Sequence, residues 1–367
     1  MNIVFRVDGS IQMGTGHVMR CLTLAEELQR LGHSCVFICR EHPGNLGDFI
    51  TNKGFVVHLL STTNGVNFTA EDDDTVHAEW LGVSWRIDAE QTLVALGSME
   101  VDWLVVDHYA LDARWEKLLG KAFGQIMVID DLADRHHACD LLLDQNLGRE
   151  IADYDHKVPE HCTRLIGPKY ALLRPEFARL REKSLERRKT PELKRILISL
   201  GGVDRTNVTA QVLSVLHDSQ LSSETELDVI MGAAAPYLND IQVQVSQIRF
   251  RATISVNVGD MAERMCRADL SIGAAGSTSW ERCCLGLPAI TVVLADNQRS
   301  AAHALSQQGV AIVAKNPEKI PDALNQLLSI GNLVKTLALM SELGANLIKG
   351  EGCLRVVEEL IKRSAKT

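Results

Sequence analysis

The sequence has no CxxC pair, no long apolar run and no excess of basic residues. Its nine cysteines are scattered, and only Cys283 and Cys284 are adjacent. An odd, dispersed set of cysteines predicts reduced thiols in a cytoplasmic protein and excludes a disulfide framework. The net charge of −9 argues against a nucleic acid as partner, because that partner favours a basic face. It still permits one small anionic ligand held by backbone amides.

Membrane insertion and secretion are not expected either. No apolar run approaches the roughly 20 residues that span a bilayer, so no membrane span is predicted. The opening residues 1–6 lack a basic segment followed by an apolar one, and they are predicted to form the first strand of the fold, not a signal peptide. No internal repeat or low-complexity segment is present. The oligomeric state leaves no signal in the sequence.

A chain of 367 residues is long for one domain and predicts two. Apolar runs alternate with amphipathic segments, which is typical of parallel sheets covered on both faces. Strands are predicted near 3–7, 35–39, 56–60, 103–106, 126–129, 141–143 and 165–167, and again near 196–200, 227–231, 254–258, 270–273, 289–294 and 310–313. The fold class is therefore α/β, with two such domains and a cleft between them.

The predicted boundaries follow changes in composition. The N-terminal domain is expected over 1–175, a charged helix and linker over 176–194, and the C-terminal domain over 195–350. A last helix over 351–367 is expected to cross back to the first domain. The polar, irregular stretch 61–88 is predicted to be a loop on the cleft side.

The first candidate site is the loop that joins the first strand to the first helix. Gly14 and Gly16 precede His17, so a histidine lies where a strand leads into a helix, the edge at which ligands collect in open α/β sheets. Such a histidine takes or gives a proton near neutral pH. Met19 occupies a glycine position of the dinucleotide fingerprint, and no Lys-Ser/Thr pair makes the loop a P-loop. A packing turn with a histidine that caps nearby amides remains an equal alternative.

Two further strands of the first half end in acidic residues. Asp107-His108-Tyr109 follows one strand and Asp130-Asp131 the next, and in a parallel sheet both face the same edge as His17. The crowded residues Asp130, Asp131, His136, His137, Cys139 and Asp140 suggest a metal, but their spacing matches no zinc pattern. No metal or other cofactor is predicted.

The second half contains a long run of small residues before a helix. Residues 273–279 leave backbone amides open to a phosphate at a helix N-terminus, and Glu281 lies one turn further on, where a carboxylate accepts hydrogen bonds from ribose hydroxyls. Thr278 and Glu281 also match a capping box, and this alternative is slightly favoured by the residues alone. Gly201-Gly202 ends a neighbouring strand, either as the other side of a diphosphate site or as a tight turn. Asp296-Asn297-Gln298 ends another, with amides that read sugar hydroxyls or cap the next helix.

Several separate motifs together resemble one family. They are R-x-D-x-S followed by GxGH-V-M-R-C-L-T-L-A near the N-terminus, V-V-D-H-Y at 105–109, I-D-D-L-A at 129–133, Y-A-L-L-R-P-E-F at 170–177 and the G-G-x-D loop at 201–204. The chain resembles the UDP-2,4-diacetamido-2,4,6-trideoxy-β-L-altropyranose hydrolases of pseudaminic acid biosynthesis, a route to flagellin glycosylation. More distantly, the second half is similar to the bacterial N-acetylglucosaminyltransferase that forms lipid II, a GT-B enzyme, at Asp260-Met261-Ala262, the G-S-T-x-x-E loop and 285–289.

The resemblance implies a GT-B fold, two Rossmann-like parallel-sheet domains facing across a cleft, and assigns roles to residues. It makes His17 the general base that activates water. It implies a sugar side formed by Asp8, Gly14, Gly16, Tyr109, Asn297 and Gln298. It implies a UDP side formed by Gly201, Gly202, Asn257, Val258, Gly276, Ser277, Thr278 and Glu281, with Glu281 on ribose and the backbone at 257–258 on uracil.

The implied reaction breaks the bond between the anomeric carbon and a phosphate oxygen of the UDP-sugar, without a metal. Attack of water opposite UDP inverts the anomeric centre. A glycosyltransferase of the same fold and a non-catalytic nucleotide-sugar sensor remain the alternatives. The stereochemistry of the sugar is read by a few side chains on loops and does not follow from the motifs.

Overall fold

Strand β1 (Asn2–Val7) places successive side chains on opposite faces of a sheet, and both faces are buried. The computed structural model describes residues 1–62, 74–120, 123–233, 235–329 and 331–365. It divides into two compact units, Met1–Leu172 with Gly352–Thr367 and Leu173–Glu351, called unit 1 and unit 2 below. None of the helices in these described ranges is long and apolar enough to cross a bilayer.

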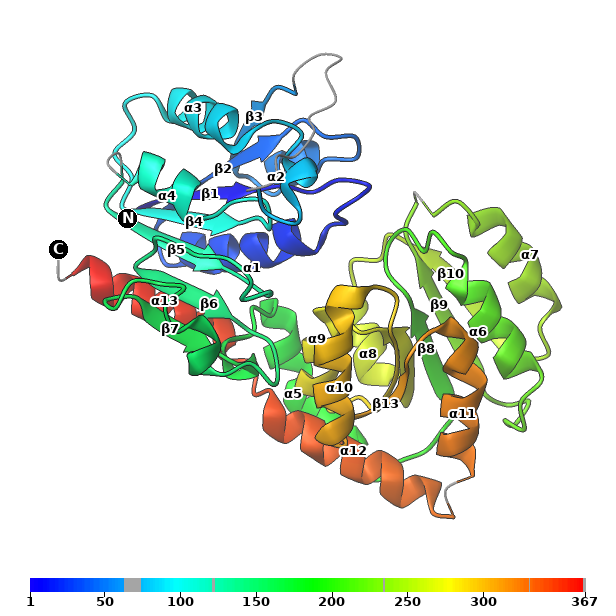
Figure 1. Cartoon of the computed structure of the whole chain (residues 1–367). Helices are drawn as coiled ribbons and strands as arrows, with labels where there is room; N and C mark the ends of the chain where they lie inside the picture. Colours follow the sequence, from blue (N-terminus) through cyan, green and yellow to red (C-terminus); the bar gives the residue numbers. More distant parts are fainter. Residues whose placement is uncertain (63–73, 121–122, 234, 330, 366–367) are drawn as a thin grey trace. The chain divides into compact units, whose positions relative to one another are not determined.

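Unit 1 is built on a seven-stranded sheet in the order β3-β2-β1-β4-β5-β6-β7, with every pairing parallel (Figure 1). Its other strands are β2 (Ser34–Arg40), β3 (Val56–Leu60), β4 (Trp103–Asp107), β5 (Gln125–Ile129), β6 (Leu141–Asp144) and β7 (Thr163–Ile166). Its helices are α1 (Gly16–Arg30), α2 (Gly47–Asn52), α3 (Trp85–Leu96), α4 (Ala113–Leu119) and α13 (Gly352–Ser364), with 3-10 turns η1 (Ala78–Leu81), η2 (Ile151–Tyr154) and η3 (Pro168–Tyr170).

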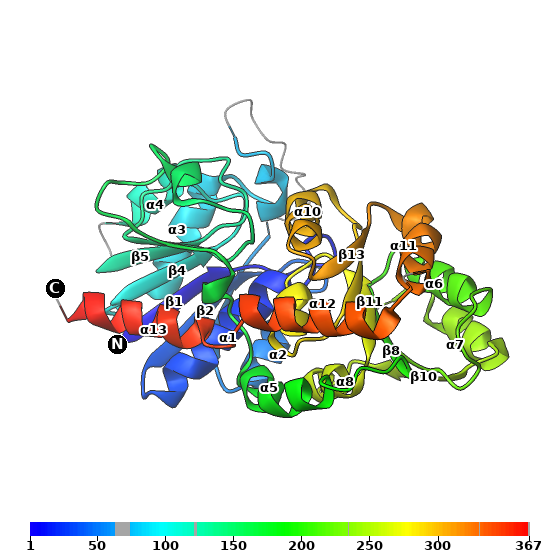
Figure 2. The same ribbon diagram turned by 90° about the horizontal axis from the view of Figure 1, so that it is seen from below.

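The alternation along β1 explains the two layers of helices on this sheet. Ile3, Phe5 and Val7 join a buried cluster with α1 and α13, whereas Val4 joins a second cluster with α3 and α4. Helix α13 packs against α1, as the view from below shows (Figure 2). The C-terminal segment thus completes unit 1, although it is remote from it in sequence.

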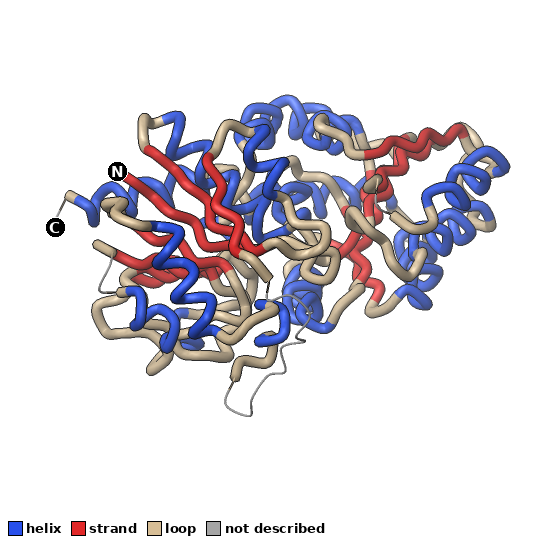
Figure 3. Tube along the Cα trace, turned by 90° about the horizontal axis from the view of Figure 1, so that it is seen from above, coloured by secondary structure: helices blue, strands red, loops and turns tan. Residues whose placement is uncertain are grey.

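Unit 2 repeats the plan with six parallel strands in the order β10-β9-β8-β11-β12-β13. They are β8 (Arg195–Ser199), β9 (Glu226–Met231), β10 (Arg251–Val256), β11 (Leu270–Ala274), β12 (Ala289–Val292) and β13 (Ala311–Ala314). Its helices are α5 (Pro175–Arg187), α6 (Val208–His217), α7 (Leu238–Gln247), α8 (Met261–Arg267), α9 (Thr278–Cys284), α10 (Arg299–Gln307), α11 (Ile320–Leu328) and α12 (Leu333–Leu347), with η4 (Asp296–Gln298) and η5 (Pro317–Lys319). In the tube view, strands of each sheet have helices beside them (Figure 3).

The segment 176–194, predicted as a charged helix and linker, packs on unit 2. Helix α5 begins at Pro175, and its Ser184 side chain is fully buried and donates to the Leu285 carbonyl at 2.7 Å. Arg188 is buried and donates to the carbonyls of Leu285, Ala268 and Met265. The charged residues therefore serve helix packing, and the chain passes between units at 172–173 and 351–352. Part of the predicted loop at 61–88, residues 63–73, lies outside the described residues.

Candidate functional site

The loop after β1 presents His17 in the first turn of α1. Gly14 has φ of +80°, which favours glycine, and a Cβ at Gly14 or Gly16 would meet no neighbouring atom. The Ser10 hydroxyl accepts hydrogen bonds from the amides of Gln12 and Met13, which closes the loop. The side chain of Thr15, the residue before the helix, caps nothing. His17 does not cap the loop either, because its ring bonds to a neighbouring strand, and the packing-turn alternative is wrong on this point.

His17 and Asp107 form a histidine–carboxylate pair. Asp107 ends β4, and His17 lies in the first turn of the helix that follows β1, the strand beside β4; Val7 of β1 lies in register with Asp107. His17 Nδ1 lies 2.6 Å from Asp107 Oδ1. The carboxylate is fully buried and the His17 side chain is 12% exposed. An ionised carboxylate only accepts, so Nδ1 donates, and in the neutral imidazole the lone pair is then on Nε2.

Arg20, one turn after His17, keeps the Asp107 carboxylate charged. Its Nε and Nη2 donate to both oxygens of Asp107 at 2.6 and 2.7 Å, and its Nη1 donates to Asp131 at 2.7 Å. Burial alone would raise the pKa of the Asp107 carboxyl, but Arg20 and His17 overcome this and hold that pKa well below its usual range. Asp107 therefore fixes the imidazole and takes no proton itself.

Tyr109 covers the imidazole from the side. Its hydroxyl donates to Asp131 Oδ2 at 2.8 Å, and its ring meets the His17 ring edge-on at 4.6 Å between centroids. Burial and the Asp131 charge raise the pKa of Tyr109, so the phenol stays a donor. The expectation that the ends of β4 and β5 share the edge at which His17 lies is confirmed by these contacts.

Two aromatic residues that the sequence did not single out complete this edge. The His77 and Trp80 rings contact each other at 4.5 Å between centroids with their planes tilted by 43°, and they lie 5.4 and 5.9 Å from the Tyr109 ring. Both belong to the segment interpreted as a polar, irregular loop. The signal that identifies them is their spacing of three, which in a 3-10 turn places both on one face.

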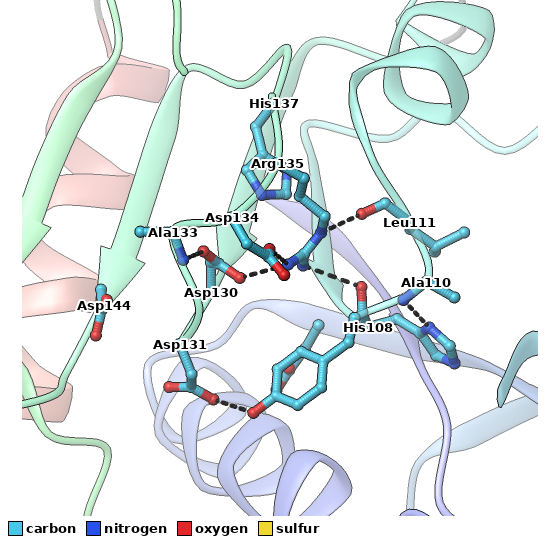
Figure 4. Close-up of polar contacts among 12 residues, drawn as sticks. His108, Ala110, Leu111, Asp130, Asp131, Ala133, Asp134, Arg135, His137 and Asp144 are labelled. Atoms are coloured by element: carbon cyan, nitrogen blue, oxygen red, sulfur yellow. Dashed lines mark hydrogen bonds and ion pairs between the residues drawn. The ribbon is translucent and has the colours of Figure 1, made fainter. Parts of the chain in front are cut away.

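The loop after β5 is held by Arg135 (Figure 4). Its guanidinium pairs with Asp130 at 2.9 Å and donates to the Leu111 carbonyl at 2.9 Å. Asp130 Oδ2 accepts from the Ala133 amide and from the Tyr154 hydroxyl. The other candidate metal ligands point elsewhere: His137 pairs with Glu116, and Asp140 accepts from the Ile126 amide. Across the described ranges, no three of these residue types converge as metal ligands.

Asp8, predicted on the sugar side, belongs to a buried network of ion pairs. It is fully buried, receives two hydrogen bonds from Arg6 and accepts from the Arg40 amide. Arg6 and Arg40 also pair with the buried Asp88. Burial would raise the pKa of Asp8, but Arg6 and the nearby histidines hold it well below its usual value. Removing one partner from such a network leaves an unpaired buried charge, typically at a cost of about 3–5 kcal/mol.

In unit 2, the small-residue loop after β11 surrounds a buried arginine. A Cβ at Gly273 would lie 2.8 Å from the Ser199 carbonyl oxygen and would clash with the Arg282 guanidinium. Arg282 is buried and donates to the Ala274 carbonyl and the Ser279 hydroxyl, both at 2.8 Å. Burial lowers the pKa of Arg282 to about 10. Packing thus explains why residue 273 is a glycine. A Cβ at Gly276 would meet no neighbouring atom, so packing does not explain that glycine.

The capping box predicted for this helix does not form. Ser277 precedes the first residue of α9, and no side chain caps the helix. Glu281 Oε1 instead accepts from Arg174 Nη2 at 3.3 Å, and burial raises the pKa of Glu281. The capping alternative, which the residues slightly favoured, is therefore wrong, and the carboxylate is held by an ion pair from the segment before α5.

The neighbouring loops of unit 2 lie at the same edge of its sheet. Ser199 pairs with Gly273 in register, so the Gly201-Gly202 turn lies beside the loop after β11, as expected. Gly201 has φ of +101°, and a Cβ at either glycine would meet no neighbouring atom. The carbonyl of Gly202 lies against Gly232, where a Cβ would clash.

The remaining predicted ligand-binding residues differ in how free their side chains are. Asn257 has φ of +50°, and its Oδ1 accepts from the Ala233 amide at 3.0 Å, so the side chain joins the loops after β9 and β10. Val258 follows it, partly buried. Gln298 Oε1 accepts from the Leu294 amide, which occupies its oxygen, and Asn297 is exposed.

Comparison with known proteins connects both units to sugar-processing proteins. Residues 196–342 match the glycosyltransferase family 28 C-terminal domain. An uncharacterized protein of Methanocaldococcus jannaschii is 26% identical, and the match covers 82% of this chain and 57% of that longer protein. UDP-2,4-diacetamido-2,4,6-trideoxy-β-L-altropyranose hydrolase of Campylobacter jejuni is 25% identical over 86% of this chain and 100% of its own. The spore coat polysaccharide biosynthesis protein SpsG of Bacillus subtilis is 25% identical, and the match covers 97% of this chain and 96% of that protein. The resemblance indicated by the motifs is thus confirmed.

Solved structures agree on the fold. MurG of Acinetobacter baumannii superposes with a TM-score of 0.66 at 18% identity, covering 98% of this chain and 99% of that one. The glycotransferase of kitacinnamycin superposes with a TM-score of 0.62 at 15% identity, covering 99% and 98%. Together with the two parallel sheets, these similarities confirm the GT-B fold class.

Proposed function

We propose that this chain hydrolyses a UDP-linked 2,4-diacetamido-2,4,6-trideoxy sugar to UDP and the free sugar, in the cytoplasm and as a step of pseudaminic acid biosynthesis. The observation that carries the proposal is the His17–Asp107 pair at the carboxyl edge of the unit 1 sheet. The Asp107 carboxylate accepts a hydrogen bond from Nδ1, and the partly exposed imidazole offers Nε2 to a water molecule. Within the described ranges, Nε2 has no protein partner that would block this role.

In the proposed reaction, His17 Nε2 accepts a proton as the water oxygen bonds to the anomeric carbon. The bond from that carbon to the UDP oxygen breaks, and its electron pair leaves with the diphosphate. The anomeric centre inverts, because water attacks opposite UDP. A positioned base contributes about 10²–10⁴-fold in rate. The buried Asp107 carboxylate stabilises the imidazolium that forms, as it stays ionised beside Arg20.

The nucleotide is assigned to unit 2. The open glycines at 201, 202 and 276 let the backbone approach a diphosphate closely. Ser277 and Thr278, at the start of α9, supply further donors. Glu281 is held near the same loop by Arg174 and has a carboxylate oxygen available for ribose hydroxyls. The backbone at Asn257 and Val258 is proposed to pair with uracil, and no metal is required.

The comparisons favour this reaction without deciding it. A relative that aligns over its whole length is named as the hydrolase of this sugar nucleotide, whereas the domain match and the solved structures carry glycosyltransferase names. A glycosyltransferase of the same fold is therefore the second candidate. The two differ in the acceptor: the hydrolase releases UDP in water alone, and the transferase requires an alcohol.

Substitution of the proposed base tests the assignment. His17→Asn keeps a side chain of similar size but removes the base, so UDP release from the UDP-linked 2,4-diacetamido sugar should fall by about 10²–10⁴-fold. Affinity for UDP, measured by calorimetric titration, should change by no more than a few-fold. His161→Asn, at an exposed site of unit 1, is the matched control and should retain full activity.

Three outcomes separate the candidates. Full activity of His17→Asn removes this residue from the mechanism. UDP release by the unaltered protein only after an alcohol acceptor is added identifies a transferase. Tight UDP-sugar binding with no turnover under either condition leaves a sensor.

A further inference from the structure

The half-buried rings of His77 and Trp80 pack against Tyr109, the residue whose ring contacts the proposed base. Within η1, Ala78 and Leu81 are buried, with relative exposures of 6% and 1%. Three residues make one turn of a 3-10 helix, so Trp80 and the N-cap residue His77 share a different face from Ala78 and Leu81. Gly82 follows with φ of +74°, and a Cβ there would lie 3.1 Å from the His42 ring. The backbone of this turn is thus packed against unit 1, with the two rings on the side of Tyr109.

The four rings form a continuous series, here called the aromatic wall: His17, Tyr109, His77 and Trp80. Tyr109 connects the two halves, because it lies 4.6 Å from His17, 5.4 Å from His77 and 5.9 Å from Trp80, centroid to centroid. Its hydroxyl is already bonded to Asp131. The ring is therefore fixed in orientation and offers mainly its carbon surface.

The position of the wall determines which part of a nucleotide sugar it meets. A general base must approach its proton within hydrogen-bond distance, and the attacking water lies against the anomeric carbon. Tyr109 contacts the His17 ring, and His77 and Trp80 contact Tyr109, so this series of rings lies on the sugar side, whereas the nucleotide is assigned to the other unit. A pyranose whose C6 is a methyl group has an apolar edge, and the negative face of an aromatic ring favours the C–H groups of that edge.

We propose that His77 and Trp80 form the subsite for the apolar edge of the sugar, and that they select a 6-deoxy sugar over one with a 6-hydroxymethyl group. This inference rests on the proposed function for the placement of the sugar near His17. A hydroxyl directed at the Trp80 ring would lose water and gain no partner, because the carbon surface of the indole accepts no ordinary hydrogen bond. Selection thus arises from the burial of a methyl group and the rejection of a hydroxyl.

The first measurement follows substrate preference. The ratio of kcat/KM for the UDP-linked 2,4-diacetamido-2,4,6-trideoxy sugar to that for UDP-N-acetylglucosamine is determined for the full chain and its variants. In Trp80→Ala, kcat/KM for the 6-deoxy substrate should fall about 10-fold, which matches the free energy of an aromatic contact. The ratio of the two kcat/KM values should therefore decrease. Trp80→Phe retains an aromatic face and should recover most of the loss.

The matched control is Trp85→Phe. Trp85 is also half-buried, belongs to the next element, and packs against Arg86 and Arg114, away from the wall. This variant should leave both the rate and the preference unchanged. The melting temperature of each variant is recorded, and Trp80→Phe carries the conclusion if Trp80→Ala is poorly folded.

The second measurement reports binding without turnover. With His17→Asn as the host, the UDP-linked 6-deoxy sugar should change the tryptophan fluorescence, and UDP alone should not. The sugar-dependent change should disappear with Trp80→Phe and persist with Trp85→Phe.

The outcomes keep this inference apart from the proposed function. If the protein hydrolyses the sugar nucleotide but Trp80→Ala and Trp80→Phe alter neither rate nor preference, the subsite is wrong and the hydrolase stands. If no hydrolysis occurs but the Trp80-dependent fluorescence change is present, the subsite stands and the hydrolase is wrong. A fluorescence change that UDP alone produces, or that survives Trp80→Phe, overturns the subsite.

Discussion

Asp144, at the end of β6, shares one hydroxyl group with a second buried carboxylate. The Tyr154 oxygen lies 2.9 Å from both Asp130 Oδ2 and Asp144 Oδ2, but a phenol has a single proton to donate. Burial raises the pKa of Asp144 to about 6, with Asp131 adding to the effect. Asp144 Oδ2 also accepts from Arg149 Nε at 2.8 Å. Below about pH 6, protonated Asp144 donates to Tyr154, which then donates to Asp130.

This arrangement predicts a pH dependence of stability. The folded pKa of Asp144, about 6, exceeds the value of about 3.9 for a free aspartate, so the folded state binds the proton more tightly. Stability should therefore fall as the pH rises from about 4 to about 6, by up to about 3 kcal/mol from this group. An NMR titration of the Asp144 carboxyl carbon should show a midpoint near 6. A midpoint near 4 for Asp144 in the unaltered protein would contradict the interpretation.

Single residues also show where sequence reasoning reached its limit. The meeting of His17 with Asp107 was predictable, because each follows or ends a strand of one parallel sheet, and parallel strands end at a common edge. The burial of Asp8 was not predicted, since the Arg40 amide that donates to it and the Asp88 carboxylate that shares Arg6 with it lie far along the chain. Arg6 and Arg40, charged residues within apolar strands, were the signal for that network. A charge inside a strand that is buried on both faces requires a partner.

At the scale of elements, strands were easier to predict than the contacts of loops and helix ends. Each predicted strand appears, because continuous apolar runs of four to six residues bounded by polar loops specify parallel strands in both sheets. The start of α9 was misjudged, because T-x-x-E describes a capping box only if the helix begins after the threonine. Here Thr278 is already helical, and Arg174, remote in sequence, takes the carboxylate.

Helix α9 supplies a test of Glu281. Glu281→Gln should weaken UDP binding, measured by calorimetric titration, more than it lowers the melting temperature, because the carboxylate is proposed to hold ribose and caps no amide. Loss of a capping bond would instead cost ~1 kcal/mol of stability. Glu263→Gln on α8, an exposed residue paired with Arg267, is the control. A lower melting temperature with unchanged UDP affinity would restore a structural role for Glu281.

At the scale of the whole molecule, the chain leaves unit 1 at Leu172 and returns to it at Gly352. The residues proposed for catalysis lie in unit 1, and those proposed for UDP lie in unit 2. Neither unit contains both sets, so the proposed reaction needs both units of the chain. The last helix was expected to cross back, and its residues Val356, Val357 and Leu360 are buried with α1 in the core of unit 1.

Truncation of the chain separates the proposed catalytic role of unit 1 from the proposed UDP binding by unit 2. A chain that ends at Lys349 lacks α13, and with it three fully buried aliphatic side chains, each worth about 1.5–3 kcal/mol. It also loses the hydrogen bond from Trp103 Nε1 to Ser364. Such a loss is comparable to the whole stability of an ordinary domain, about 5–15 kcal/mol, so unit 1 should unfold while unit 2 persists.

Calorimetry and ligand titration should register this difference together. The truncated chain should lose one unfolding transition and all UDP release, and it should keep UDP affinity within a few-fold, because the proposed nucleotide site lies entirely within Leu173–Glu351. As the control, a chain from which only the last two residues are removed should behave as the full chain. Retention of both transitions after removal of α13 would mean that the core of unit 1 does not depend on this helix. Loss of UDP affinity with unit 2 still folded would move the nucleotide site away from the loops after β8 and β11.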